Sequence, residues 1–199
     1  KSGSYSGKTA PVKFTAGEPT HVLIDKLKPN TQYYYRMRYK DAGAGNFEAR
    51  AEHTFHTQRP AGSAFTFVVE FDPHMMEGNN PEAFKLSLKK MLADKPDFML
   101  DLGDNFFVDR ERPATQAHVL SRVQLLRSYW DLINHSVPLL LTMGNHEGEW
   151  ARQLDGTPNN VAVLDATNRK KYIPNPEANG FYTSSEKPEQ RSEEHTSEL

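Results

Sequence analysis

The sequence has no cysteine among its 199 residues. This absence excludes a disulfide framework, an iron–sulfur cluster and a thiolate zinc site, and it fits an oxidising or a reducing compartment equally well. A run of about 18 apolar residues, which a membrane-spanning helix needs, is also missing. No charged-then-apolar signal segment opens the chain. The chain is long enough to bury a full core, so we expect a folded protein whose compartment must be argued from other features.

Neither positive nor negative charge is in large excess. The 24 Lys and Arg residues are balanced by 26 Asp and Glu residues, which gives a net charge of −2. A balanced chain has no basic footprint for nucleic acid or for an anionic membrane surface. We therefore expect no nucleic-acid specificity and no membrane span, and the oligomeric state stays open.

Both ends of the sequence look interrupted. It begins with Lys1 instead of Met and continues through a polar stretch, so we expect the natural N-terminus, with any signal peptide, to be missing. Residues 191–199 read RSEEHTSEL, which resembles the in-frame translation of a common sequencing-library adapter. We interpret them as an artefact tail and leave them out of the predicted fold.

Residues 1–58 predict antiparallel β structure. Apolar and polar positions alternate over 11–58, as in half-exposed strands, and clusters of turn formers separate the segments. The predicted strands are Thr20–Leu27, Gln32–Tyr39 and Ala49–His56. The pattern Leu-x-Pro-x-Thr-x-Tyr-x-Tyr, from Leu27 to Tyr35, resembles the second half of a fibronectin type III-like sandwich. We therefore predict a partial all-β sandwich of this type, with its early strands before Lys1.

The pattern changes after a linker at 59–63 that contains Pro and Gly. Short apolar runs now alternate with segments of helical periodicity, which is typical of buried parallel strands and the helices that cover them. The predicted strands are Phe65–Phe71, Asp97–Leu102 and Val137–Thr142, and the predicted helices follow Asn80 and span Thr115–Asn134. Residues 158–183 are less clear, with a short helix at Val161–Lys171 and a strand at Gly180–Thr183. The fold class over 64–190 is thus a layered α/β sheet.

Each predicted α/β strand is followed by polar residues of the kinds that bind metals. The clusters are Asp72-Pro73-His74, Gly103-Asp104-Asn105 and Gly144-Asn145-His146-Glu147. Because ligands bind beyond the carboxyl ends of the strands in open α/β sheets, we expect the three clusters to converge. Gly103 and Gly144 leave room for sharp turns and for the close approach of a substrate.

The donor atoms suit a pair of cations. Asp72 and His74, two apart on an extended segment, are expected to clamp one cation as an oxygen and a nitrogen donor. Asp104 has two oxygens and can bridge two cations, and Asn145 offers a neutral carbonyl oxygen to the second. These donors accept manganese, iron or zinc, so the identity of the metals stays open.

Three motifs occur in order, each after a predicted buried strand: Asp-x-His, Gly-Asp, and Gly-Asn-His followed by an acid. Together they resemble the motifs of the calcineurin-like metallophosphoesterase family. The resemblance covers 64–190 as the N-terminal part of such a domain. It implies a two-metal site that hydrolyses phosphate monoesters or diesters. By the same resemblance, Asp72 and His74 bind the first metal. Asp104 bridges the two metals, and Asn145 binds the second metal.

The other roles in such a site concern proton transfer. His146 is predicted to give a proton to the departing alkoxide or to stabilise its charge, because imidazole in general titrates near neutral pH. Glu147 is predicted to orient that imidazole through one ring nitrogen. The family's further ligands are histidines from later loops, which this sequence does not reach. We therefore expect the fragment itself to bind two metals poorly and to be inactive.

The pairing of the two predicted domains is also similar to purple acid phosphatases, but two positions differ. Those proteins lack the histidine present here as His74, and Phe107 stands where their iron-binding tyrosine is expected. Because phenylalanine has no ligand atom, we expect no purple tyrosinate–iron chromophore. The domain pairing also implies export to the periplasm or the exterior.

Several interpretations stay open beside this one. A binding or adhesion protein with a degenerate, non-catalytic phosphatase-like domain would carry similar strand-end motifs. Asp101 is interpreted as a capping or supporting group, and the role of Glu70 is unresolved. The basic run at 169–171 could hold a phosphate, although a solvated helix end is the favoured interpretation.

Overall fold

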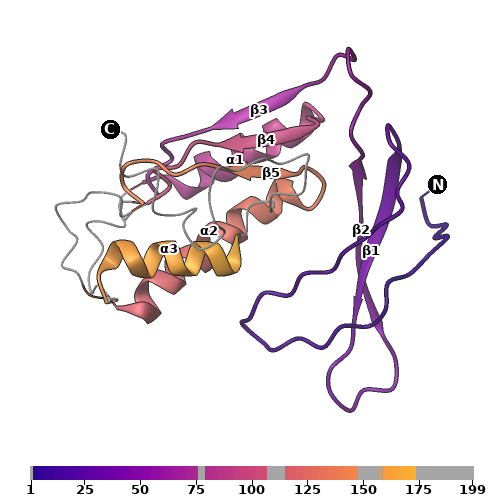
Figure 1. Ribbon diagram of the computed structural model, residues 1–199, viewed down its shortest axis with the longest axis horizontal. Helices are drawn as coiled ribbons and strands as arrows, with labels where there is room; N and C mark the ends of the chain where they lie inside the picture. The colour runs from indigo at the N-terminus through magenta and orange to yellow at the C-terminus, as the bar shows by residue number, and fades with distance from the viewer. Residues whose placement is uncertain (1, 76–78, 107–114, 148–156, 158, 174–199) are drawn as a thin grey trace.

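The computed structural model describes residues 2–75, 79–106, 115–147, 157 and 159–173, and it consists of a long β ribbon beside a helix-covered sheet (Figure 1). Strand β1, Gln32–Tyr39, pairs in antiparallel fashion with β2, Glu48–His56. Tyr33 and Phe55 lie directly opposite each other, and their rings stack at 5.6 Å. The second and third predicted strands are thus confirmed with almost unchanged bounds.

The first predicted strand, Thr20–Leu27, is wrong. Residues 2–31, all of which the structure describes, contain turns and irregular chain but no strand. Lys26 has a left-handed φ of 57°, which interrupts an extended segment, and Leu23 is 85% exposed. An alternating segment becomes a strand only where a partner completes its backbone hydrogen bonds. The described part of 1–58 is therefore a two-stranded ribbon, and the sandwich stays a prediction.

The α/β part contains a parallel sheet with the strand order β3-β4-β5. Its strands are β3, Phe67–Glu70, β4, Phe98–Asp101, and β5, Leu139–Leu141. Each lies inside a predicted strand, so the three predictions are confirmed with shorter bounds. Val68, Met99 and Leu139 share one register position and belong to the hydrophobic core.

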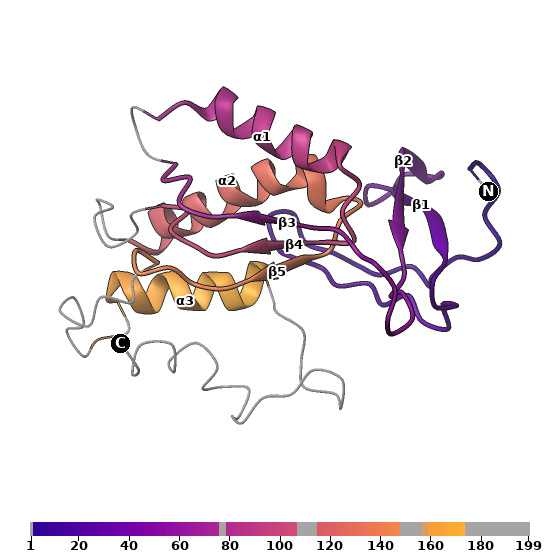
Figure 2. The ribbon, with the colours of Figure 1, turned by 90° about the horizontal axis from the view of Figure 1, so that it is seen from above.

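The described helices pack side by side against this core, with α2 between α1 and α3 (Figure 2). They are α1, Pro81–Ala93, α2, Gln116–Asn134, and α3, Val161–Tyr172. The Asn80 side chain caps α1 by accepting hydrogen bonds from two backbone amides, as predicted, and Thr115 caps α2. The fully buried side chains include Leu88, Met99, Val119, Leu126 and Ile133. None of the helices in the described ranges has the length and apolar character to cross a membrane.

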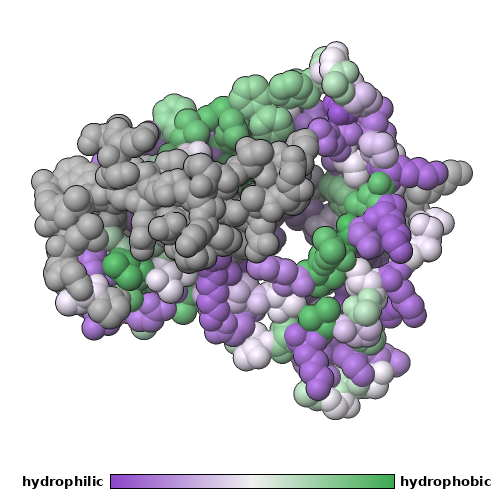
Figure 3. Space-filling view, viewed as in Figure 1, coloured by the Kyte–Doolittle hydropathy of each residue, from purple (hydrophilic) through white to green (hydrophobic). Residues whose placement is uncertain are grey.

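The opposite face of the sheet carries aromatic residues. The rings of Phe67 and Phe98, neighbours in register, stack at 5.4 Å with planes 6° apart. Phe65 stacks on Phe98 at 5.9 Å. Phe65, Phe67 and Phe71 are exposed, and the region of β3 is accordingly green in Figure 3. The described helices therefore leave this face of the sheet uncovered.

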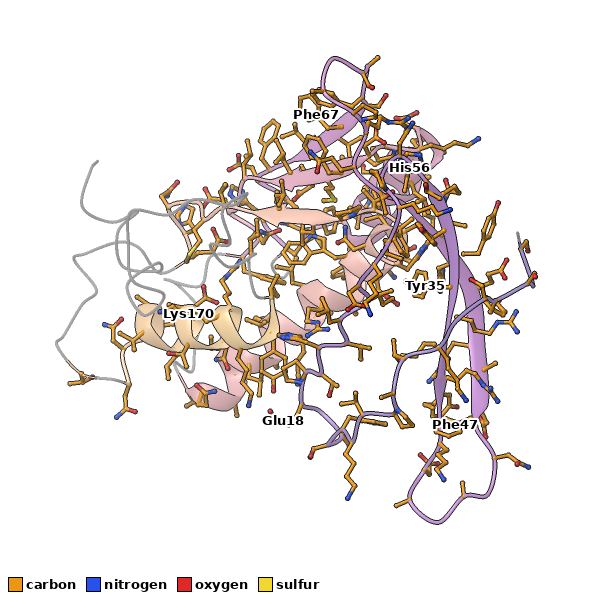
Figure 4. All side chains as sticks on the ribbon, turned by 45° about the vertical axis from the view of Figure 1, so that its right-hand side comes forward. Glu18, Tyr35, Phe47, His56, Phe67 and Lys170 are labelled. Atoms are coloured by element: carbon orange, nitrogen blue, oxygen red, sulfur yellow. The ribbon has the colours of Figure 1, made fainter. Side chains whose placement is uncertain are left out.

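The ribbon touches the α/β part at the C-terminal end of α2. Tyr35 Oη donates a hydrogen bond of 2.6 Å to the carbonyl of His135, and Figure 4 shows Tyr35 where the ribbon meets the helices. The ring of His53 stacks on that of His135 at 4.2 Å. The amide of Thr54 donates to Ser136 Oγ at 3.4 Å. Contacts from both strands thus attach the ribbon to one helix end.

Candidate metal centre

The loops that follow β3 and β4 run side by side. Backbone amides of the first loop donate to carbonyls of the second, which places the two strand ends together. The bonds are Asp72 N to Gly103 O at 3.1 Å, His74 N to Asp104 O at 3.2 Å and Met75 N to Asn105 O at 2.7 Å. The two loops therefore converge beyond the carboxyl ends of their strands, where α/β proteins commonly bind ligands.

Asp72, His74 and Asp104 bring their donor atoms together. One ligand atom of each residue lies within 4.8 Å of the other two. Nε2 of His74 is 3.3 Å from Oδ1 of Asp72 and 3.9 Å from Oδ2 of Asp104. Asp104 is buried, His74 is half-buried and Asp72 is exposed, so the cluster reaches from the protein interior to solvent.

The backbone of all three residues is left-handed. Their φ angles are 53° at Asp72, 44° at His74 and 55° at Asp104. Non-glycine residues rarely adopt this conformation, which costs about 1–3 kcal/mol each and is concentrated at functional sites. The sequence predicts Asp72 and His74 on one side of an extended segment, and that geometry is wrong. A left-handed turn brings their side chains together instead.

The loop after β5 joins the cluster through the contact of two glycines. A Cβ on Gly103, whose φ is 88°, would lie 2.0 Å from the amide nitrogen of Gly144. A Cβ on Gly144 would lie 2.3 Å from Oδ1 of Asp104. Neither position has space for a side chain. Glycine is therefore required at both positions because the β4 and β5 loops cross there.

Asn145 and His146 follow the second of these glycines. The amide of His146 donates to Oδ1 of Asp104 at 2.7 Å and fixes one oxygen of that carboxylate. His146 is buried, and its ring lies edge-on to the ring of His74, with centroids 5.9 Å apart and planes at 86°. Asn145 is exposed on the same loop. Its role as a ligand of a second cation stays a prediction.

Glu147 connects the β4 and β5 loops. Its buried carboxylate accepts backbone hydrogen bonds of 2.7 Å from Asp104 and from Gly144, and one of 2.9 Å from Asn105. Oε1 also lies 3.1 Å from Nη2 of Arg169. These contacts engage both carboxylate oxygens. Glu147 therefore connects the two loops, and its predicted role of orienting an imidazole stays a prediction.

Two further acids support the β4 loop. Asp101 is fully buried, and its Oδ1 accepts hydrogen bonds of 2.9 Å from the Gly103 amide and from Nδ2 of Asn105. These bonds agree with its interpretation as a capping or supporting group. Burial, followed by a hydrogen bond with Asp101, raises the pKa of Glu70 to about 10. Burial is also the largest cause that raises the pKa of Asp101, so the two buried acids can share a proton.

Sequence reasoning misses Arg169 and Asp165. The interpretation of 169–171 as a solvated helix end fits the exposed Lys170 and Lys171, but it is wrong for Arg169, which is 5% exposed. Nε of Arg169 lies 2.8 Å from Oδ2 of Asp165, one helical turn earlier. The signal in the sequence is helical spacing, because the buried positions of α3 are 161, 164, 165, 168, 169 and 172.

The guanidinium of Arg169 remains charged in this buried position. Burial disfavours the charged form, but the neighbouring carboxylates of Asp165 and Glu147 outweigh that effect and raise the pKa of Arg169 above its usual value. The positive charge therefore lies between two buried acids, one on its own helix and one between the two loops.

The donor set at the strand ends fits a metal cation. Asp72 and Asp104 bring two carboxylates close to one imidazole, and a cation between them would offset the repulsion of like charges. Oxygen and nitrogen donors suit manganese, iron or zinc, and the sequence has no thiolate to favour a softer metal. Together with His74, these residues would hold one metal ion.

The sequence comparison places this α/β protein among the phosphoesterases. Residues 66–192 match the calcineurin-like phosphoesterase family, and this match covers more than half of the chain. The chain belongs to that family, and the predicted family resemblance is confirmed. A comparison with curated proteins gives no match.

Among solved structures, the chain is similar to the purple acid phosphatase PPD1 isolated from seeds of yellow lupin, Lupinus luteus, with a TM-score of 0.55. The two sequences are 19% identical, and the match covers 77% of this chain and 28% of the lupin protein. At this identity the likeness shows the fold alone. The chain thus spans less than a third of the length of that relative.

Proposed function

We propose that this protein hydrolyses phosphate esters with two metal ions bound beyond the ends of β3, β4 and β5. The observation that carries the proposal is the cluster of Asp72, His74 and Asp104, whose donor atoms lie within 4.8 Å of one another in a chain of a phosphoesterase family. Family membership supports hydrolysis of a phosphoester. The substrate is proposed only as a class, which includes monoesters and diesters.

The chain would hold the two metals with residues from three loops. Asp72 and His74 are proposed as ligands of the first metal, Asp104 as the bridging ligand and Asn145 as a ligand of the second. Two cations about 3.5–4 Å apart lower the pKa of a water and stabilise both the attacking and the leaving oxygen of an in-line displacement. The hydrogen bonds between the loops hold three of these ligands in place in advance, so little reorganisation is needed.

His146 is proposed as the proton donor to the leaving group. Its ring lies 5.9 Å from the ring of His74, at the edge of the cluster. Its backbone amide is engaged with Asp104, which fixes the main chain from which the imidazole projects. A positioned imidazole can protonate a departing alkoxide, and such proton transfer typically contributes about 10²–10⁴-fold to the rate.

The first test is binding of manganese to this chain, measured by calorimetry and by electron paramagnetic resonance. The second test is release of p-nitrophenol from p-nitrophenyl phosphate and from bis(p-nitrophenyl) phosphate. We expect the chain alone to bind manganese weakly and to release little product. A longer protein that adds the family's later histidines should release product in a manganese-dependent way. In that protein, His146→Ala should lower the rate by about 10²–10⁴-fold.

Hydrolysis that is independent of metal would contradict the two-metal site. Stoichiometric metal and normal turnover on residues 1–190 alone would contradict only the expectation that further ligands are needed. Manganese binding without hydrolysis in the longer protein would instead favour a non-catalytic binding or adhesion protein.

A further inference from the structure

Helix α3 supplies a buried arginine to the loops that carry the proposed metal ligands. Nη2 of Arg169 lies 3.1 Å from Oε1 of Glu147. That carboxylate accepts the amides of Asp104 and Asn105 from the β4 loop and of Gly144 from the β5 loop. We propose that Arg169 is a positioning residue of the metal site and that it acts through Glu147. This inference rests on the proposed function of the site.

The Glu147 carboxylate needs a countercharge in its position. It is 1% exposed, and a carboxylate removed from water is stable only when it is both hydrogen-bonded and paired. The backbone amides supply hydrogen bonds but no net charge. Among the described residues, Arg169 supplies the full positive charge in contact with it. Without Arg169 the carboxylate would move toward water, and its bonds to the two loops would break.

Arg169 is itself held in place by contacts of α3. Asp165 binds its Nε at 2.8 Å on one side. Nε2 of Gln116 donates to Oδ1 of Asn168 at 2.9 Å, and Nη1 of Arg127 donates at 2.7 Å to the last carbonyl of α3. These bonds fix α3 to α2 at two points around the arginine. The guanidinium is therefore presented by an anchored helix, which makes it suited to setting the position of Glu147.

One hydrogen bond connects this arrangement to a proposed metal ligand. The amide of His146 donates to Oδ1 of Asp104 at 2.7 Å, and His146 directly precedes Glu147. A displacement of Glu147 therefore moves the donor that orients the Asp104 carboxylate. Loss of a partner that orients a metal ligand typically costs about 10–100-fold in metal affinity. A purely structural ion pair would lower stability but leave the affinity of the folded protein unchanged.

The test compares three variants of the full chain. Arg169→Met removes the charge at similar length, Arg169→Lys keeps the charge without the planar fork, and Lys170→Met is the control on the same helix. The first readout is the dissociation constant of manganese. The second, made without metal, is hydrogen exchange of the amides of Asp104, Asn105 and Gly144. We expect Arg169→Met to weaken manganese binding about 10–100-fold and to speed exchange at these amides, while those of α1 are unchanged.

We expect an intermediate affinity for manganese in Arg169→Lys and the wild-type affinity in Lys170→Met. Combining Arg169→Met with Glu147→Gln should weaken binding no more than the larger single effect, because both act on one contact. Wild-type affinity and wild-type exchange in a folded Arg169→Met variant would overturn the proposal. If that variant does not fold, wild-type affinity in both Arg169→Lys and Glu147→Gln would overturn it.

The two readouts separate this proposal from the proposed function. A wild-type chain that binds no manganese contradicts the metal site, whatever the state of the loops. Amide exchange at Asp104, Asn105 and Gly144 reports on the loops in the absence of metal. Unchanged exchange in Arg169→Met, in a chain that binds manganese, contradicts only the positioning role.

Discussion

Gly103 and Gly144 cross so closely that a Cβ on Gly103 would lie 2.0 Å from the amide nitrogen of Gly144. Gly103 also has a φ of 88°, in the left-handed region. We expect Gly103→Ala to lower the free energy of unfolding by about 2–5 kcal/mol, the sum of backbone strain and overpacking. Urea denaturation measures this loss.

Gly62→Ala is the matched control for that variant. Gly62 has a φ of 81°, but nothing lies within 4 Å of a Cβ at this position. Its substitution should cost only the backbone strain, about 1–2 kcal/mol. Equal losses in the two variants would show that the β4 and β5 loops do not cross as described.

Metal binding should stabilise the protein through Asp104. A ligand that binds only the folded chain adds about 2.7 kcal/mol to the free energy of unfolding at about 100 times its dissociation constant. Asp104→Asn removes the charge but keeps an oxygen that can accept from the His146 amide. We expect manganese to raise the melting temperature of the wild-type chain and to leave that of the variant almost unchanged, as measured by calorimetry.

Asp94→Asn provides the comparison for charge alone. Asp94 is an exposed residue at the C-cap of α1, outside the metal-ligand cluster. This variant should respond to manganese as the wild type does. If Asp104→Asn gained as much stability from manganese as Asp94→Asn, Asp104 could not be a bridging ligand.

The strands and helices of the α/β part can be predicted because their patterns are local. Val119, Val123 and Leu126 recur at helical spacing and are all buried in α2. Thr20–Leu27 shows the limit of this reasoning. Its alternation is typical of a strand, but a strand also needs a partner, and the sequence of the segment does not specify one. The parallel strands β3, β4 and β5 are one another's partners, and their near-continuous apolar runs indicate buried strands even before the pairing is known.

The ligand cluster can be predicted from the sequence, but its detailed geometry cannot. Asp72, His74 and Asp104 follow strands that end at the same edge of a sheet, so their proximity follows from topology. Their left-handed backbone depends on hydrogen bonds between the two loops. The burial of Arg169 depends on the docking of α3 on α2. Both arise from contacts between distant segments, which no local pattern reveals.

The stack of His53 on His135 should make the junction of the two parts sensitive to acid. Burial, followed by the charge of His53, lowers the pKa of His135 below its usual value of 6.5, while Asp131 acts in the opposite sense. As the pH falls through 6.5, the unfolded chain therefore takes up a proton at His135 before the folded chain does. The stability that this group contributes at neutral pH is thus lost in acid.

His53→Phe tests this pH dependence because it keeps a ring against His135 and removes the second charge. The fall in melting temperature between about pH 7.5 and about pH 5 should be smaller in this variant than in the wild type. His21→Phe, at an exposed position, should keep the wild-type fall. An equal fall in all three proteins would exclude the histidine pair as its source.

Phe107 should distinguish this chain from purple acid phosphatases, although it lies outside the described residues. Those proteins, to which the predicted pairing of domains is similar, are expected to have an iron-binding tyrosine at this position. A phenyl ring has no donor atom, so the iron-loaded protein should show no strong visible absorption band.

Phe107→Tyr supplies a phenolate oxygen three residues after Asp104 and should create the band. Phe47→Tyr, in the exposed hairpin of the ribbon, should not. A strong band in the iron-loaded wild-type protein would mean that another group binds the metal as a tyrosinate does.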